Sequence, residues 1–430
     1  MNASRSPLPP LRDERFALPA GVHWTPVETA HRVLRERLQC VMASETLPVA
    51  QASGRILAAA VHALRAHPPC ANAAVDGFGF AHAAVGAGQQ ALPLVAGGAA
   101  AGAPYKGKVP PGHAIRILTG AQLPEGVDTI LPQEDVSHSA GKITFREPVK
   151  PHANTRKGGE DVAAGAALLP AARRITPADI ALLTAAGVPI VPVRKQLRVA
   201  VISTGNELAA PKPPASPHQI HAHQIYDANR PMLLALLAQV GCVPVDMGQE
   251  PDDRDTLRAR LDHASSQVDA IVTSGGVSAG DEDHVAALLT DHDQHALWRI
   301  AIKPGRPLVL ARWNTTPIFG LPGNPVAAML CSLIFVRPAL GLLAGEGWHL
   351  PAPLLLPAAF EKRKKPGRRE YLRARVRSSQ VEVFPFEGSG RISGLSWAEG
   401  VVELLEGTTE ITRGTPVRYL PHSAFGLGGC

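Results

Sequence analysis

The sequence is poor in aromatic residues and in cysteine. Phe, Trp and Tyr make up 4% of its 430 residues, whereas glycine and proline contribute 40 each. This composition favours a loop-rich chain of several domains over a helical bundle. The five cysteines are far apart and form no CxxC pair, which argues against a zinc ribbon or a disulfide scaffold and indicates a reducing compartment.

Long hydrophobic runs are missing as well. The longest apolar stretch, VAAMLCSLIFV at 326–336, has 11 residues, which suits a buried helix and is too short to span a bilayer. Residues 1–24 lack the apolar core of a signal peptide and are predicted to be a flexible leader. We therefore expect a cytoplasmic protein that does not enter membranes.

The charge balance is only mildly basic. Lys and Arg number 43 against 37 Asp and Glu, a formal net charge of +6. No basic surface interleaved with aromatic residues is visible in the sequence, so nucleic-acid binding is not expected. The hydrophobic fraction of 45% excludes global disorder and supplies enough apolar material for several cores.

Changes in periodicity predict a multi-domain α/β chain. Its centre is a doubly wound, mostly parallel sheet domain, joined by a helical or mixed N-terminal domain, a β-rich lid domain and a β-barrel-like C-terminal domain. The expected bounds are 1–24 for the leader, 25–60 with 152–195 for the N-terminal domain, 61–151 for the lid, 196–346 for the α/β domain and 347–430 for the C-terminal domain.

Three distinctive peptides each follow a predicted strand of the α/β domain. They are STGNEL at 203–208, SGGVSAGDED at 274–283 and LPGNP at 321–325. In doubly wound folds such positions lie at the carboxyl edge of the sheet, where ligands bind at a topological switch point. The sequence therefore predicts one ligand site where three loops converge.

The second of these peptides places two glycines before three carboxylates, Asp281, Glu282 and Asp283. Acids at a helix N-terminus stabilise the helix dipole, and this alone can explain such a cluster. Because a strand end and two glycines precede them, we expect at least one to be functional. Glu207 follows a similar turn, and an exposed loop acid explains it equally well. No Lys-Ser or Lys-Thr follows the glycines, which argues against a P-loop ATPase.

Positive charge gathers at two Pro-Gly turns, IKPGRP at 302–307 and KRKKPGRRE at 362–370. A solvated basic loop is the ordinary explanation, but such turns also suit phosphates and oxyanions. His218, His221 and His223 share one Pro-rich loop without a nearby cysteine, so no metal site is expected there.

In their order and spacing, these motifs resemble the molybdopterin molybdenumtransferase family (MoeA and the C-terminal domain of gephyrin) over essentially the whole chain from Thr25. The motifs are PPCANAAVDGFGF, IRILTGAQLPEG, NTRKGGEDVAAG, VISTGNELAAP, QIYDANRPML, TSGGVSAGDED, IKPGRP, GLPGNPVAA and KKPGRREYLR. The resemblance implies that adenylylated molybdopterin is bound and its pyrophosphate link is cleaved with help from Mg²⁺. Molybdenum from molybdate is then placed on the dithiolene and AMP is released, the last step of molybdenum cofactor synthesis.

The resemblance also implies roles for individual residues. The acids expected in catalytic positions are Asp76, Asp161, Glu207, Asp252 and Asp283, with Glu207 and Asp283 as metal ligands. The residues expected to bind substrate are Thr119, Ser274, Gly275, Gly276, Arg299, Lys303, Arg306, Pro322, Gly323, Asn324 and Arg368. Backbone N–H groups of 274–276 are expected to hold a phosphate, and Lys303 and Arg368 to meet the phosphates or molybdate.

The sequence departs from the family pattern at four positions. Ala73, Val75 and Phe78 stand where Ser, Met and Tyr are usual, and Arg299 stands where lysine is usual. No central carboxylate is lost, but the first three changes leave open whether substrate contacts in the N-terminal half are those of common members.

Two other functions are compatible with parts of the pattern. One is a catalytically reduced paralogue that binds and delivers molybdenum or tungsten cofactor. The other is the adenylyltransferase of the preceding step, which shares the α/β domain, although the additional segments 25–193 and 347–430 argue against it. The resemblance further implies an elongated homodimer whose cofactor cleft lies between the α/β domain of one subunit and the β-rich domain of the other. Candidate partners are molybdopterin adenylyltransferase and molybdoenzyme apoproteins.

Overall fold

The computed structural model forms two compact units, one inserted into the other along the chain. Thr46–Val193 form the inserted unit, and the segments on either side of it, up to Glu45 and from Arg194, form the main unit. The residues that the structure describes are 24–428 without 147, 211–220, 222, 278–283, 291–295, 306, 387 and 389.

The main unit is built on a six-stranded sheet. Its strand order is β16-β13-β17-β21-β20-β18, with bounds Val243–Glu250, Arg198–Thr204, Ala270–Ser274, Thr316–Leu321, Pro307–Trp313 and Ala296–Arg299. The first four strands pair in parallel, and β20 and β18 extend the sheet in antiparallel fashion. The predicted doubly wound, mostly parallel sheet is confirmed.

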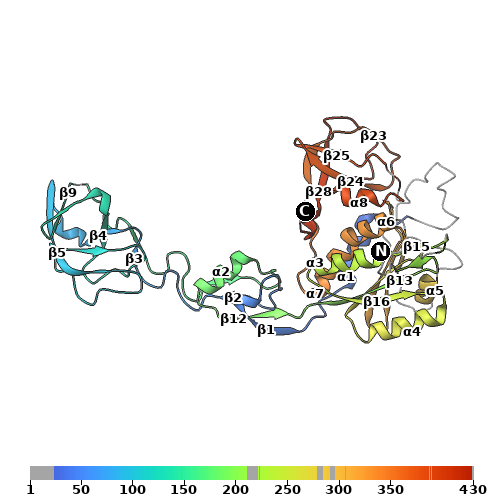
Figure 1. Cartoon of the computed structure of the whole chain (residues 1–430), viewed down its shortest axis with the longest axis horizontal. Helices are drawn as coiled ribbons and strands as arrows, with labels where there is room; N and C mark the ends of the chain where they lie inside the picture. The colour runs from blue at the N-terminus through green and yellow to red at the C-terminus, as the bar shows by residue number, and fades with distance from the viewer. Residues whose placement is uncertain are drawn as a thin grey trace, which may run out of the picture. The chain divides into compact units, whose positions relative to one another are not determined.

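Helices cover both faces of this sheet (Figure 1). Val199, Val201 and Val272 share one core with α1, α3 and α6, whereas Ile202 and Ile271 share a second core with α4 and α5. The helix bounds are Val27–Arg37 for α1, Asn229–Gln239 for α3, Arg254–Ser265 for α4, His284–Thr290 for α5 and Pro325–Cys331 for α6. The helices leave the carboxyl edge of the sheet as the place for a ligand.

Helix α1 packs into the core of the main unit. Its residues Val27, Ala30 and Leu34 are fully buried there, because their spacing places them on one face of the helix. The sequence had grouped 25–60 in one domain with 152–195, whereas the boundary of the units falls between Glu45 and Thr46.

A single apolar helix runs through the main unit from Pro325 to Ala344. It has 20 residues and a mean hydropathy of 2.1, enough by length and composition to cross a membrane, but 83% of its most apolar window is buried inside the protein. It is therefore a core helix. It is also longer than the apolar run in the sequence, because it continues through Arg337 and Pro338 as α7, Arg337–Ala344.

A π-helical segment, Ser332–Val336, allows the helix to pass the proline. Within it the N–H of Arg337 donates to the carbonyl of Ser332, five residues back. Pro338 has no N–H to offer the carbonyl of Ile334. Nε2 of His31 on α1 bonds that carbonyl instead, at 3.0 Å, so α1 completes the hydrogen bonding of the kinked helix.

His31 is therefore neutral, with its proton on Nε2. The ring is buried, and Nδ1 has no hydrogen-bond partner. Burial lowers the pKa of His31 from 6.5 to about 4, and this effect exceeds the opposing influence of Glu28. Protonation would place a charge in an apolar site between Phe335 and Trp348, whose rings lie 5.1 and 5.5 Å away.

The main unit should lose stability as the pH falls from about 6.5 toward 4. The unfolded chain binds a proton at residue 31 more readily than the folded chain, so the stabilisation is present above the unfolded pKa and is lost as the pH falls. The difference corresponds to about 3 kcal/mol in the free energy of unfolding. Denaturant titrations at several pH values should show this slope in wild type and a smaller one in His31→Gln, which keeps an N–H donor but does not titrate. Equal slopes would contradict the assignment.

The inserted unit contains a six-stranded sheet and a smaller helical part. The sheet order is β7-β4-β6-β5-β9-β8, with bounds Thr129–Pro132, Gly77–Phe80, Ala114–Ile117, Gln89–Ala99, Lys142–Arg146 and Ser137–Ser139. In the smaller part α2, Pro177–Ala185, begins at the capping box of Thr176 and Asp179.

The C-terminal strands of the main unit form a second sheet, β19-β24-β26-β28-β22, with β25 beside β24. The bounds are Ile302–Lys303, Arg369–Arg377, Gly400–Leu404, Pro416–Pro421, Leu354–Pro357 and Gln380–Val383. The short strand β19 belongs to the loop before β20. The C-terminal sheet therefore joins the α/β region directly beside one of the two basic turns.

Candidate active site

The three motif loops of the main unit meet at the carboxyl edge of its sheet. Parallel register pairs Ser203 with Ser274 and Ser274 with Leu321, so the three strands end at the same level. The N–H of Gly275 donates to the carbonyl of Leu321 at 3.1 Å. This bond joins the loop after β17 to the loop after β21.

Two glycines of the middle loop are required by the backbone. Gly275 has φ +97° and Gly276 φ +66°, values that favour glycine. A Cβ at Gly275 would lie 2.7 Å from the carbonyl oxygen of Thr204, and one at Gly276 would lie 2.7 Å from Cγ2 of Val285. The loop thus packs against its neighbours while its glycines stay partly exposed, an arrangement in which the N–H of Gly276 can approach an anion.

The hydroxyl of Ser274 is already hydrogen-bonded within the protein. Its side chain is buried, and its Oγ accepts a hydrogen bond from Nδ2 of Asn229 at 2.7 Å. What this residue can offer a ligand is therefore its backbone.

The loop after β21 ends in a helix cap. Oδ1 of Asn324 accepts from the N–H groups of Val326 and Ala327 at 3.1 and 3.2 Å. Pro322 is buried and Gly323 is exposed beside Gly275. The amide oxygen of Asn324 is therefore used within the cap. What this loop can offer a ligand is the N-terminal end of the apolar helix, which favours negative charge.

Glu207 lies on an exposed turn that is hydrogen-bonded to the loop of Asp252. Oδ2 of Asp252 accepts from the N–H of Asn206 at 3.0 Å, and the N–H of Asp252 donates to Oδ1 of Asn206 at 3.3 Å. Gln249 donates to the carbonyl of Gly205 at 2.9 Å. Among the residues that the structure describes, none bonds the Glu207 carboxylate, so its oxygens are available to a ligand. Asp252 holds the turn that carries it.

The two basic turns are neighbours in space. Ile302 pairs with Arg369 and Lys303 with Glu370 in the β19–β24 ladder. The carboxylate of Glu370 is buried between two ammonium groups, 3.5 Å from Lys303 and 3.4 Å from Lys362. Two positive charges thus flank one negative charge at the start of the loop that follows Lys303.

Part of the second turn is structural. Nζ of Lys364 donates to the carbonyls of Lys365, Arg368 and Glu406 at 3.0 to 3.3 Å, and burial lowers the pKa of Lys364. The guanidinium of Arg368 lies over Trp24, 5.8 Å from the ring centroid. Lys364 therefore holds the turn closed, whereas Arg368 is half-buried beside Trp24.

Arg299 ends β18 opposite Pro307, beside the first basic turn, and its carbonyl accepts from the N–H of Thr25 at 2.9 Å. Asp283 and Arg306, which the sequence predicts as a metal ligand and a substrate-binding residue, lie outside the described residues, as do Asp281, Glu282 and His218.

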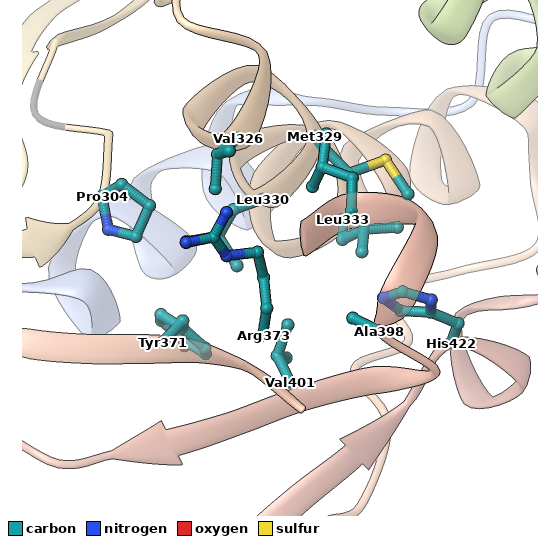
Figure 2. A pocket seen from close by; sticks show the side chains of 11 residues that line it. Pro304, Val326, Met329, Leu330, Leu333, Tyr371, Arg373, Ala398, Val401 and His422 are labelled. Carbon is teal, nitrogen blue, oxygen red and sulfur yellow. The ribbon is translucent and has the colours of Figure 1, made fainter. Parts of the chain in front are cut away.

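A pocket of about 340 Å³ lies below Pro304, between α6 and the C-terminal sheet. Figure 2 shows it, with Arg373 of β24 extending toward Val326 and Leu330 of α6. The Arg373 guanidinium donates to the carbonyl of Phe386 at 2.7 Å. The lining is mostly apolar and contains no carboxylate, and burial lowers the pKa of its imidazole, that of His422.

The predicted residues of the N-terminal half lie in the inserted unit. Oδ1 of Asp76 accepts from the N–H and the hydroxyl of Thr119 at 2.7 and 2.6 Å. These bonds, with a smaller influence of Arg116, lower the pKa of Asp76. Asp161 is exposed near the loop of His67, whose carbonyl accepts its N–H at 3.2 Å. Asp76 is thus an exposed, ionised carboxylate in a fixed orientation.

The three departures from the family pattern near Asp76 are packing positions. Ala73 is fully buried, Phe78 is 4% exposed, and Val75 packs against the same cluster as Ala73. The guanidinium of Arg116 lies 5.0 Å above the Phe78 ring. These side chains shape the sheet beneath Asp76 and do not project toward a ligand.

Thr119→Val should raise the pKa of Asp76 toward its ordinary value. The variant loses the hydroxyl donor but keeps the backbone donor, so the ionised form loses one of its two bonds. The carboxyl ¹³C shift of Asp76, followed by NMR through an acid titration, measures this directly. Thr144→Val, at an exposed threonine of the same unit, is the matched control and should leave the titration unchanged. An unaltered midpoint in Thr119→Val would contradict the role of the hydroxyl.

Two residues of the edge were not predicted as site residues. Asn229 lies in the motif QIYDANRPML and bonds Ser274 and Gly323. The hydroxyl of Thr204 is buried without a hydrogen-bond partner beside Gly275 and Gly276. The only signal in the sequence was their place in motifs after strands, which does not distinguish a buried side chain from an exposed one.

Comparison with known proteins gives matches along the whole of this architecture. Residues 25–187 match the MoeA N-terminal region (domains I and II), 200–341 a probable molybdopterin binding domain and 356–422 the MoeA C-terminal region (domain IV). The molybdopterin molybdenumtransferase of Haemophilus influenzae is 34% identical over 403 residues, covering 92% of this chain and 98% of that protein. Molybdopterin molybdenumtransferase 2 of Mycobacterium tuberculosis is 33% identical over 410 residues, covering 91% and 98%.

Solved structures match as well. The crystal structure of the molybdopterin biosynthesis MoeA protein from Pyrococcus horikoshii OT3 superposes with a TM-score of 0.80 at 26% identity, covering 93% of this chain and 100% of that one. A second structure of the Pyrococcus horikoshii protein gives a TM-score of 0.77 at 28% identity.

Proposed function

Since this chain belongs to the molybdopterin molybdenumtransferase family, whose members are transferases of molybdenum cofactor biosynthesis, we propose that it transfers molybdenum from molybdate to adenylylated molybdopterin and releases AMP. The observation that carries this proposal is the meeting of three strand-end loops at one sheet edge. There two positive-φ glycines lie beside a helix N-terminus, on the same edge as the unbonded carboxylate of Glu207.

The glycine loop supplies the anion-binding part of the site. The backbone N–H of Gly276 holds the pyrophosphate, and the N-terminal end of α6, capped by Asn324, adds to the positive potential. Lys303 and Arg368 lie on the two adjacent basic turns and attract the second oxyanion, molybdate.

Mg²⁺ is the metal that this edge would take, held by Glu207, Asp283 and phosphate oxygens. The described residues contain no group of three His, Cys, Asp or Glu that could hold a metal ion. Mg²⁺ usually takes one or two carboxylates together with substrate phosphates, and the exposed, unbonded Glu207 fits that donor set. When bound, the metal neutralises the charge of the phosphates around the bond that breaks.

Asp76 and Asp161 complete the site from the inserted unit of a second subunit. In this proposal the protein is a cytoplasmic homodimer, and each cleft contains the loops of one main unit and the two acids of the partner's inserted unit. Thr119 keeps Asp76 ionised and directed outward, as a residue that meets a cationic or hydrogen-bonding group requires. Molybdopterin adenylyltransferase supplies the substrate, and apoproteins of molybdoenzymes receive the product.

AMP release from adenylylated molybdopterin tests the proposal, with Mg²⁺ and molybdate each added or omitted. Release that requires both ions and yields active molybdenum cofactor is the expected result. Tight substrate binding without AMP release would instead identify a carrier. Ala73, Val75 and Phe78 are packing positions, so these departures from the family pattern do not by themselves favour a carrier.

A further inference from the structure

We infer that Asn229 is a positioning residue that holds the glycine loop after β17 and the loop after β21 at a fixed separation, an inference that rests on the proposed function for its catalytic consequence. Asn229 is the first residue of α3, and its side chain is buried. It acts through the backbone and side chain that it bonds.

The side-chain amide of Asn229 bridges the two loops. Nδ2 donates to Oγ of Ser274 at 2.7 Å and to the carbonyl of Gly323 at 2.6 Å. A carbonyl oxygen only accepts, so the bond to Gly323 fixes which end of the amide is the nitrogen. Both donor hydrogens are therefore used, one on each loop.

The amide oxygen of Asn229 indicates that its surroundings fix the orientation of the amide. Asn229 is 6% exposed, and its buried Oδ1 has no hydrogen-bond partner among the residues that the structure describes. A buried acceptor that remains unbonded destabilises the folded state. A rotated amide would place Oδ1 against the carbonyl of Gly323, where two acceptors repel each other. Asn229 thus bonds both loops although its Oδ1 has no described partner.

The segment that carries Asn229 is itself firmly held. Arg230 bonds the buried carboxylate of Asp227 at 3.2 Å and both oxygens of Asp246 on β16 at 2.7 Å. These ion pairs attach the start of α3 to the sheet. Asn229 therefore approaches the loops from a fixed position, as a residue that sets their spacing must.

The same segment reaches the third loop. The N–H of Ile225 donates to the carbonyl of Glu207 at 2.8 Å, and the N–H of Asp227 donates to the carbonyl of Ala209 at 2.9 Å. Residues 225–229 thus connect the turn of Glu207, the glycine loop and the loop of Gly323. Loss of the Asn229 bridge would remove the side-chain connection between the glycine loop and the Gly323 loop. The backbone bond from Gly275 to Leu321 and the attachment of the Glu207 turn would remain.

Hydrogen exchange and kinetics of Asn229→Ala and Asn229→Asp test the inference. Asp keeps the size of Asn and its place at the helix start but cannot donate, so both variants should behave alike. We expect exchange to rise about tenfold at the backbone amides of 275–277 and 323–324 and to stay unchanged in α4, since local opening is set by local bonds. Asn314→Gly is the control, because Asn314 has φ +54° in a distant turn where glycine is tolerated.

The kinetic readout separates positioning from general loss of folded protein. Fewer folded molecules lower the apparent kcat and leave KM unchanged. Misplacing the phosphate loops should raise KM about tenfold and lower kcat/KM about 100-fold, because a displacement near 1 Å costs this much, while the thermal midpoint stays close to that of wild type.

Unchanged exchange at both loops in either variant would overturn the inference, whatever the activity. A wild-type KM in Asn229→Asp, with a fully folded protein, would overturn it too. If wild-type protein released no AMP, the proposed function would fail, but exchange at 275–277 and 323–324 would still decide whether Asn229 holds the loops.

Discussion

Gly275→Ala should reduce AMP release at least about 100-fold, because the loop that holds the phosphate must move to admit the methyl group. The added Cβ would lie 2.7 Å from the carbonyl oxygen of Thr204 and 2.9 Å from its hydroxyl. Backbone is a poor partner in such a clash, since it cannot rotate away as a side chain does. Relief requires displacement of the loop from β13, and with it of the N–H of Gly276, the proposed phosphate donor. Substrate affinity, measured by calorimetry, should fall together with the rate.

Gly248→Ala is the matched control for this experiment. Gly248 lies in β16 of the same sheet with φ +84°, and a Cβ there would meet no heavy atom within 4 Å. Both substitutions place alanine in the left-handed region, which costs about 1 kcal/mol. Only Gly275→Ala adds the contact with Thr204. Equal losses of activity in the two variants would show that backbone conformation, and not the position of the loop, explains the effect.

Glu207→Gln should lower kcat about 100-fold or more and weaken the dependence of the rate on Mg²⁺. The variant keeps the shape of the side chain but removes its negative charge. No described residue bonds the carboxylate, so the fold of the turn should not change. The measurement is AMP release across a range of Mg²⁺ concentrations.

Asp252→Asn tests whether the loss of activity belongs to the Glu207 carboxylate or to the turn that carries it. Asp252 accepts the N–H of Asn206, and an amide oxygen can still accept it. The loss should therefore be smaller than in Glu207→Gln, about tenfold or less, as is usual for a residue that orients another. If Asp252→Asn were the more damaging change, the roles of the two acids would have to be exchanged.

The sheet and its loops were predictable because their signals are local. The parallel strands of the α/β region contain apolar runs that end in a glycine or a polar turn, and a helical pattern follows each of them. The carboxyl ends of parallel strands share one edge, so the motif peptides could be placed together without knowledge of any contact. Helix α2 was predictable for the same reason, because Thr176 and Pro177 mark its start.

The contacts between distant segments could not be predicted in this way. The pairing of Ile302 with Arg369 joins two basic turns that no periodicity connects. The hydrogen bond between His31 and Ile334 depends on a π-helical turn, and an apolar run before a proline does not indicate one. Lys364 resembled a solvated charge and is instead buried among carbonyls. In each case the decisive quantity is burial, which depends on the tertiary structure rather than on residue type.

The insertion of one unit into the other affects how the protein is made. The chain leaves the main unit near Ala43 and returns at Lys195, whose N–H donates to the carbonyl of Ala43 at 2.9 Å. Helix α1 leaves the ribosome first, but α7, against which it packs, is synthesised only after the whole inserted unit. Contacts between segments so distant form slowly.

The apolar face of α1 must therefore stay uncovered through most of translation. The inserted unit is complete in sequence before the main unit and should fold first, so α1 is the part of the nascent chain that needs protection by a chaperone. Ribosome-bound chains stalled after Val193 should show a protease-resistant inserted unit and a protease-sensitive α1. Resistance of α1 should arise only when α7 has emerged.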